Sequence, residues 1–138
     1  MLKIHYSFII VVVLIIIISV IFTVYGDRDD MKTVCRFLES YGWEVDNAPI
    51  DTADVIIPKE FDEVYKNYNV IQKKSELDLS PYKGMKGIRY TFIVKNYPID
   101  VGETVYANVI VINSQPVAGD IMTVSLDGFM HGLGENGA

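Results

Sequence analysis

An uninterrupted apolar run from Phe8 to Val24, without a charged residue, Gly or Pro, constrains this chain more than any other feature. Counted from Tyr6 to Tyr25, the segment has 20 residues. As an α-helix it spans roughly 30 Å, the thickness of the hydrocarbon core of a bilayer. Its polar members, Ser19 and Thr23, can bond to carbonyls of the same helix. We therefore predict a transmembrane helix at residues 6–25, with the lipid bilayer as its partner.

The charges on either side of this segment predict its orientation. Lys3, His5 and the amino terminus precede it, whereas three acids and two bases occupy residues 26–32. Basic residues favour the cytoplasmic side of a membrane. We expect residues 1–5 to lie in the cytoplasm and residues 26–30 to form a juxtamembrane linker, with the rest of the chain outside the cell.

The alternative is a signal peptide that is cleaved near Val24-Tyr25-Gly26 and leaves a secreted protein. The apolar run is longer than the roughly 7–15 residues of a usual signal-peptide core. An uncleaved signal anchor is therefore favoured.

The part of the chain beyond residue 25 has the composition of one acidic domain. It carries 11 Lys and Arg and 18 Asp and Glu, so its net charge is 11 − 18 = −7. This charge disfavours nucleic acid as a partner. Cys35 is the one cysteine, so the domain contains no internal disulfide. We predict an extracytoplasmic domain at 31–133 and a flexible tail at 134–138.

Hydrophobic periodicity predicts two helices in this domain. The first runs from Met31 to Tyr41, with Asp29 or Asp30 as its N-cap and Gly42 as the residue that ends it. Its apolar stripe has helical spacing: Met31, Val34, Cys35, Leu38 and Tyr41. The second begins at Pro58 and ends near Lys74. Its apolar positions are Phe61, Val64, Tyr65, Tyr68, Ile71 and, at the flank, Val70.

The strands follow from period-2 patterns and turn signals. Two short ones are expected at Trp43–Val45 and, after a turn at residues 51–53, at Asp54–Ile57. Three longer ones are expected at Ile88–Tyr97, Thr104–Asn113 and Val117–Leu126. Ser114–Pro116 is interpreted as a turn, and a last short strand is expected around Phe129–Leu133. In the first long strand Ile88, Tyr90, Phe92 and Val94 share one face. The second is apolar on both faces, as a central strand should be.

Short connections between consecutive strands favour antiparallel pairing. The predicted fold class is α+β: an antiparallel sheet of about five strands packed against two helices, with one face of the sheet covered by helix.

Scattered motifs resemble the bacterial domain-of-unknown-function family 4830. They include Tyr41-Gly42-Trp43-Glu44-Val45, Ile57-Pro58, Asp78-Leu79-Ser80 and Asn96-Tyr97-Pro98. The last of them is Leu126-Asp127-Gly128-Phe129-Met130-His131-Gly132. The resemblance covers about residues 34–133 and implies an extracytoplasmic, membrane-tethered protein of a Gram-positive bacterium. It implies no activity, substrate or catalytic residues.

The sequence supports no metal or cofactor site. His131 is the one histidine beyond the apolar segment, and neither a cysteine cluster nor a calcium-binding loop is present. A Cys35–His131 nucleophilic pair is conceivable, but Cys35 falls on an apolar helix stripe that favours burial. No Gly-x-Ser-x-Gly motif supports a serine hydrolase.

Asp120 is the most informative acidic residue. Period-2 counting places it on the same strand face as Met122, Val124 and Leu126, which we interpret as the core face. A carboxylate there is either catalytic, with a raised pKa, or a structural acceptor of backbone N–H groups from a neighbouring loop. The structural role is favoured, and Asp127 before Gly128 is interpreted as a turn residue.

The leading functional hypothesis is a non-enzymatic binding or accessory domain that contacts an envelope or membrane protein. The candidate interaction surface consists of five residues near the C-terminus: Asp120, Asp127, Phe129, Met130 and His131. The alternative is a small envelope hydrolase that uses His131 with Asp120 or Asp127. That function requires these side chains to converge within hydrogen-bonding reach.

Overall fold

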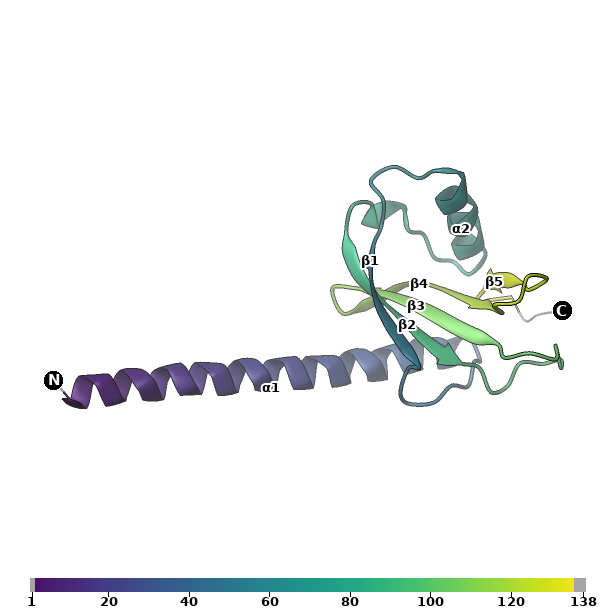
Figure 1. Cartoon of the computed structure of the whole chain (residues 1–138). Helices are drawn as coiled ribbons and strands as arrows, with labels where there is room; N and C mark the ends of the chain where they lie inside the picture. Colours follow the sequence, from purple (N-terminus) through teal and green to yellow (C-terminus); the bar gives the residue numbers. More distant parts are fainter. Residues whose placement is uncertain (1, 136–138) are drawn as a thin grey trace.

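A computed structural model describes the backbone of residues 2–135 and the side chains of residues 6–23 and 30–135. It contains three helices and five strands in the order α1 (Leu2–Ser40), β1 (Asp51–Ile56), α2 (Glu63–Lys74), the 3₁₀ helix η1 (Ser80–Tyr82), β2 (Lys86–Ile93), β3 (Tyr106–Ile112), β4 (Gln115–Met122) and β5 (Met130–Gly132). Figure 1 shows a globular part at the C-terminal end of a long helix. The predicted α+β class is confirmed.

The helix α1 is longer than either of the two segments from which it was predicted. It runs without a break through residues 26–30, so the segment predicted as a linker is helical. It ends where expected, because Gly42 has a φ of +89° and the N–H of Trp43 donates to the carbonyl of Leu38. The apolar segment and the first helix of the domain are therefore one element (Figure 1).

The sheet is an antiparallel meander in which each strand pairs with the next along the chain, in the order β1-β2-β3-β4-β5. β1 begins at Asp51, so the turn predicted at 51–53 is part of a strand that pairs with Arg89 to Thr91. The strand predicted at Trp43–Val45 is reduced to one bridge between Val45 and Val94.

The boundaries of β4 differ from the prediction at both ends. Asn113 and Ser114, with φ of 50° and 59°, form the tight turn after β3, and Pro116 lies inside β4 beside a bulge. At the other end β4 stops at Met122, because Thr123 and Phe129 exchange hydrogen bonds that close a loop. Val124 and Leu126, predicted on the core face, are exposed in that loop.

Both faces of the sheet carry a hydrophobic core, which corrects the expectation of one helix-covered face. The C-terminal part of α1 packs against one face, where Val34, Leu38 and Phe92 are fully buried and the predicted α1 stripe lies in contact with the sheet. The other face lies under α2 and the loops around it, with a smaller core: Ile57, Leu79, Ile110, Ile112, Val117 and Ala118. The double-sided pattern of β3 reflects this arrangement.

The helix α2 begins at Glu63, five residues after Pro58. The carboxylate of Asp62 accepts a hydrogen bond from the N–H of Tyr65, which places the N-cap at Asp62. The buried side of α2 includes the polar residues Asn69 and Gln72, whereas Val64, predicted to be apolar and inward, is 71 % exposed.

The predicted tail at 134–138 is described in part. The carboxylate of Glu135 accepts hydrogen bonds from the N–H of Gly132 and from Lys74, and Gly134 donates its N–H to Ser75. Residues 134 and 135 therefore contact α2 and β5, while residues 136–138 lie outside the described part.

Candidate functional site

A row of polar side chains crosses the sheet on the face that α2 covers. In the strand register Asp51 pairs with Thr91, Thr91 with Asn108, and Asn108 with Asp120. Paired residues in a sheet point to the same face, so four neighbouring strands contribute one polar residue each. This polar row interrupts an otherwise mainly apolar surface.

Hydrogen bonds link the row to α2. The hydroxyl of Thr91 donates to Oδ1 of Asn108 at 2.7 Å, and Nδ2 of Asn108 donates to Oδ1 of Asp120 at 2.9 Å. The hydroxyl of Tyr68, on α2, donates to Oδ2 of Asp120 at 2.7 Å. Each carboxylate oxygen of Asp120 thus receives a hydrogen bond from a neutral side chain, rather than from the loop backbone that the sequence suggested.

Burial changes the acid–base properties of Asp120 and Tyr68. Asp120 is 2 % exposed, and burial raises the pKa of its carboxyl group, an effect that the hydrogen bonds from Asn108 and Tyr68 partly offset. Burial, together with the neighbouring carboxylate, also raises the pKa of Tyr68 well above its ordinary value. Tyr68 therefore remains a protonated hydrogen-bond donor at physiological pH.

Arg89, on β2, is close enough to Asp120 to affect its carboxyl group. The charge of Arg89 lowers the pKa of that group, although its direct ion pair is with Asp51, at 3.7 Å between Nη2 and Oδ2. The Nε of Arg89 is buried and has no hydrogen-bond partner among the described residues. The guanidinium of Arg89 is therefore only partly paired by Asp51.

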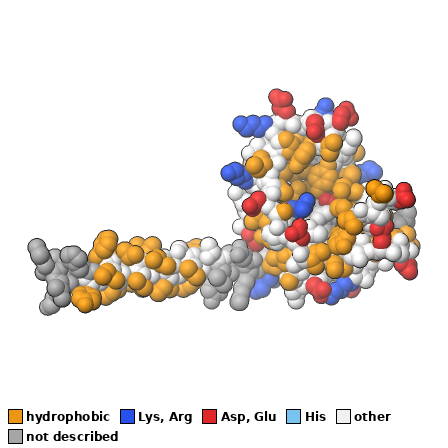
Figure 2. Space-filling model, viewed as in Figure 1, with side chains coloured by type: hydrophobic (Ala, Val, Ile, Leu, Met, Phe, Trp, Pro, Cys, Tyr) orange, Lys and Arg blue, Asp and Glu red, His pale blue; other side chains and the backbone are white. Residues whose placement is uncertain are grey.

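A pocket of about 490 Å³ lies between α2 and this face of the sheet. Asp120, Asn108 and Arg89 contribute polar atoms to its lining. Most of its wall is apolar or aromatic: Val55, Val64, Tyr65, Tyr68, Ile71, Ile110, Met122 and Met130. Figure 2 shows hydrophobic side chains gathered beside α2, with charged side chains around them. We call this feature the Asp120 pocket.

Polar contacts tie α2 to the loop that follows it and to the sheet. Asn69 donates a hydrogen bond to the carboxylate of Asp78 and accepts the N–H of Leu79. The hydrogen bond from Asn69, followed by those from Ser80, lowers the pKa of Asp78 to about 2. Gln72 accepts the N–H of Gly119 at 2.8 Å. At the C-terminal end of α2, a Cβ on Gly132 would lie 2.8 Å from the carbonyl of Ile71, so glycine permits this close approach.

Comparison with protein families gives one match. The family described as a domain of unknown function, DUF4830, matches residues 37–121, more than half of the chain. The chain belongs to the DUF4830 family. No curated protein and no solved structure matches the chain.

The DUF4830 match covers most of the Asp120 pocket. It includes α2 and the polar row from Asp51 to Asp120, and it ends before Met122 and Met130, which also line the pocket. The pocket is therefore built mainly by the part of the chain that defines this DUF4830 domain.

The structure divides the five predicted surface residues among three places. Asp120 and Met130 line the pocket. Phe129 and His131 stack on each other at a centroid distance of 5.4 Å, next to Trp43 and Tyr97 on the α1 side of the sheet. Asp127 is exposed in the turn that the N–H of Gly128 closes onto Ser125.

His131 is engaged within this aromatic cluster of Trp43, Tyr97, Phe129 and His131. Its Nδ1 lies 2.8 Å from the carbonyl of Gly132 and must donate to it, so in the neutral ring Nε2 accepts the hydroxyl of Tyr97 at 3.0 Å. His131 pairs with Ile121 in the sheet, whereas Asp120 pairs with Gly132. Since neighbouring strand residues point to opposite faces, His131 and Asp120 do not converge on one pocket.

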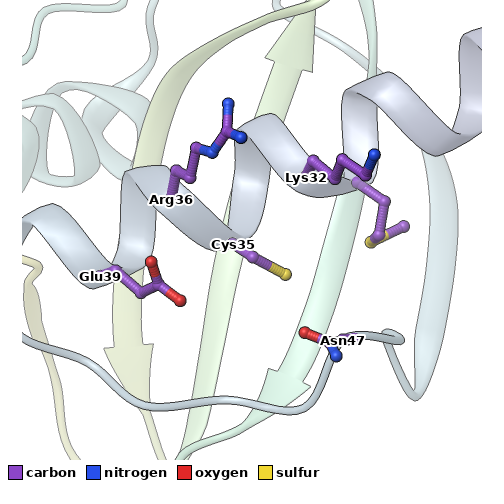
Figure 3. A pocket seen from close by; sticks show the side chains of 6 residues that line it. Lys32, Cys35, Arg36, Glu39 and Asn47 are labelled. Carbon is purple, nitrogen blue, oxygen red and sulfur yellow. The ribbon is translucent and has the colours of Figure 1, made fainter.

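A second pocket, of about 500 Å³, lies beside α1 (Figure 3). Met31, Lys32, Cys35, Arg36 and Glu39 line it from the helix, and Asn47 lines it from the following loop. Burial, with the charge of Glu39, raises the pKa of the Cys35 thiol, which disfavours the thiolate needed for nucleophilic chemistry. Within the described part of the chain, no three His, Cys, Asp or Glu residues are arranged to hold a metal ion.

Sequence reasoning identified Asp120 but missed the residues around it in this DUF4830 domain. Thr91 and Arg89 lie on the strand face opposite Tyr90 and Phe92, as the predicted alternation along this strand implies. Their relation to Asn108 and Asp120 depends on the register between strands. The signal that could have found the row is a polar residue at an inward position on each of three successive strands.

Proposed function

We propose that this protein is a single-pass, membrane-anchored binding protein whose DUF4830 domain works outside the cell membrane, without catalytic activity of its own. The observation that carries the proposal is the exposure of the described side chains in the apolar part of α1. Residues Tyr6–Thr23 form a stretch long and apolar enough to cross a membrane, and none of it is buried by the rest of the protein. Lipid would cover this surface.

The hydroxyls within the stretch suit a lipid environment. Ser19 donates to the carbonyl of Ile16, and Thr23 donates to those of Ser19 and Val20, so the helix satisfies both donors itself. Unsatisfied polar groups are costly in the hydrocarbon core. These contacts support a helix that resides in the bilayer.

The short distance along α1 between the apolar stretch and the domain core is evidence for a domain close to the membrane. From Thr23 to Val34, the first fully buried residue of the domain core, the helix rises about 16 Å. A partner of the domain would therefore lie near the membrane surface, which favours an envelope or membrane protein. The proposed orientation, with residues 1–5 in the cytoplasm and the domain outside a Gram-positive cell, is supported by the flanking charges in the sequence.

The geometry lends no support to the alternative, a hydrolase that uses His131 with Asp120 or Asp127. His131 belongs to the aromatic cluster on the α1 side of the sheet, and Asp120 lies in the pocket on the other side. Asp127 is in an exposed turn. We therefore do not propose a reaction.

Protease treatment of intact cells tests the proposed topology. The full chain should stay with the membrane after an alkaline wash, and added protease should remove the domain and leave the span. Lysed cells, with both sides accessible, provide the control. A domain that protease reaches after lysis alone would overturn the orientation, and a shortened chain in the medium would show that the apolar segment is a cleaved signal peptide.

Photo-crosslinking from the domain tests the partner. A crosslinker at Met130, an exposed residue at the edge of the Asp120 pocket, should capture one envelope or membrane protein in intact cells. The same group at Val124, an exposed position in the loop after β4, is the matched control. Equal products from the two positions would contradict a specific contact surface.

A further inference from the structure

We propose that the Asp120 pocket binds an apolar organic cation, whose protonated amine pairs with the carboxylate of Asp120 while its apolar body lies between α2 and the sheet. This inference rests on the proposed function as a binding domain and names the chemical class of a ligand. It does not depend on which side of the membrane the domain occupies.

Asp120 is a buried carboxylate that forms no ion pair with a basic side chain in the described part of the domain. Its two hydrogen-bond donors, Tyr68 and Asn108, are neutral. The ion pairs described within residues 30–135 do not include Asp120, and Arg89 is paired with Asp51. Buried charges in proteins are usually matched by an opposite charge, because an unmatched one is costly. A cationic ligand would supply the missing charge.

The carboxylate also has room for another donor. An ionised carboxylate can accept about four hydrogen bonds, and Asp120 accepts one at each oxygen from the side chains around it. Tyr68 and Asn108 fix the orientation of the group, and Asp120 is part of the pocket lining. An ammonium group in the pocket can therefore approach a carboxylate that is already positioned.

The walls of the pocket suit an apolar body attached to that amine. The rings of Tyr65 and Tyr68 stand edge to face at 6.4 Å between centroids, and tyrosine faces attract cations. Met122 and Met130 provide flexible side chains that adapt to an apolar ligand. The volume of about 490 Å³ is that of a small-molecule site.

Charge distinguishes a cation from the other ligand classes. The chain has a net charge of −6, which attracts cations and repels anions. An anion in the pocket would lie close to the Asp120 carboxylate, whose negative charge would repel it. A neutral apolar molecule would leave Asp120 buried without a counter-charge.

The test measures binding of three small probes to the full chain in phosphatidylcholine nanodiscs. The probes share an aromatic body and differ in charge: 2-phenylethylamine, 2-phenylethanol and 3-phenylpropionate. Methyl NMR signals of Met122 and Met130 report binding in the pocket, and empty nanodiscs correct for partition into lipid. The amine should bind at least about tenfold more tightly than the alcohol, as a charge-assisted hydrogen bond in a buried site predicts.

Two matched variants locate the interaction. Asp120→Asn should lower the affinity for the amine by about tenfold or more and leave the affinity for the alcohol unchanged. Asp127→Asn removes the same charge at an exposed turn and should change neither the affinity for the amine nor that for the alcohol. Equal binding of the amine and the alcohol, preference for the carboxylate, absence of binding by all three probes, or an unchanged amine affinity in Asp120→Asn would each overturn the proposal.

The pH dependence of the wild-type protein keeps the test independent of whether the variant folds. Affinity for the amine should rise as pH rises through the pKa of Asp120, because the protonated carboxyl group carries no charge. The titratable and charged groups around Asp120 are Tyr68 on α2, Arg89 on β2 and His131 on β5. Tyr68 stays protonated in this range, because burial and the neighbouring carboxylate raise its pKa. An amine affinity that does not change between acidic and neutral pH, or a rise that persists in Asp120→Asn, would contradict the role of Asp120.

The two proposals can fail separately. Protease accessibility in cells decides the topology, and probe binding in nanodiscs decides the ligand class. A domain that binds the amine but faces the cytoplasm would retain the pocket and lose the proposed location.

Discussion

The hydroxyl of Tyr68 on α2 donates a hydrogen bond of 2.7 Å to the carboxylate of Asp120 on β4, across the space between helix and sheet. These residues are 52 positions apart in the chain. Their contact ties the helix to the polar row and defines one side of the pocket. It also makes the stability of this region depend on the charge of one buried group.

Replacing Tyr68 with Phe should destabilise the domain. The substitution removes a hydrogen bond to a buried carboxylate, which is worth about 1.5–3 kcal/mol. Urea unfolding at neutral pH measures the change in the free energy of unfolding. Tyr65→Phe is the control, because the Tyr65 hydroxyl has no hydrogen-bond partner among the described residues. Equal effects of the two substitutions would contradict the importance of the Asp120 contact.

Asp120→Asn should change how stability depends on pH. Burial raises the pKa of Asp120 in the folded state above its ordinary value. The stabilising contribution of this group is therefore fully present below its pKa in the unfolded chain and is lost as pH rises through its pKa in the folded state. The free energy of unfolding of Asp120→Asn, relative to that of the wild type, should therefore increase from pH 4 to pH 7. Urea unfolding at each pH measures it, and Asp127→Asn is the control. A difference that is constant with pH would show that the folded-state pKa is not raised.

Leu38→Ala should show that the end of α1 belongs to the core of the domain. Leu38 is fully buried against the sheet, and removal of such a side chain costs about 2–5 kcal/mol. Chemical denaturation monitored by the fluorescence of Trp43 measures the loss. Leu126→Ala, at an exposed position, should stay within about 0.5 kcal/mol of wild type. A small effect at Leu38 would mean that the sheet does not require α1.

Ser114→Gly should stabilise the β3–β4 hairpin. Ser114 has a φ of 59°, in the left-handed region that glycine adopts more readily than other residues. The gain should be about 1 kcal/mol, and thermal unfolding should show it as a higher midpoint. Ser114→Val, which adds a β-branched side chain at the same φ, should have the opposite effect. If glycine and valine were equivalent there, the turn would not have positive φ.

The Cys35 thiol should react slowly with a thiol reagent such as iodoacetamide. Burial raises its pKa, so less thiolate is present at pH 8 than in an exposed cysteine. Mass spectrometry of the modified chain gives the rate. The same chain unfolded in urea provides the reference, and it should react faster. Equal rates in the folded and unfolded states would show that α1 does not protect Cys35.

The sequence predicted those parts of the fold that depend on local pattern. The stripe of Val34 and Leu38 at helical spacing, and the double-sided pattern of β3, correctly indicated buried surfaces. The start of α2 was wrong, because Pro58 and Asp62 both suit a helix N-terminus and the choice between them depends on the hydrogen bond from Tyr65 to Asp62. Local pattern also gave no reason for Val64 to face outward.

Asp120 is the residue of the candidate site that could be identified from the sequence. Asp120 stood out as a carboxylate at an inward position of a strand, a conflict that often marks a functional or strained site. Its partners Asn108 and Thr91 are 12 and 29 positions away, and the strand register brings them into one row. A shift of that register by one residue would turn them to the other face, so a single sequence cannot identify them.

The unbroken course of α1 from Leu2 to Ser40 has a consequence for the orientation of the domain. A continuous helix transmits rotation as well as position, and each added residue turns the following part by about 100°. In the proposed membrane-anchored protein, the number of residues between the bilayer and the sheet therefore sets the direction in which the Asp120 pocket opens along the membrane plane. Inserting one alanine after residue 30 would point that opening toward a different neighbour while preserving the pocket itself.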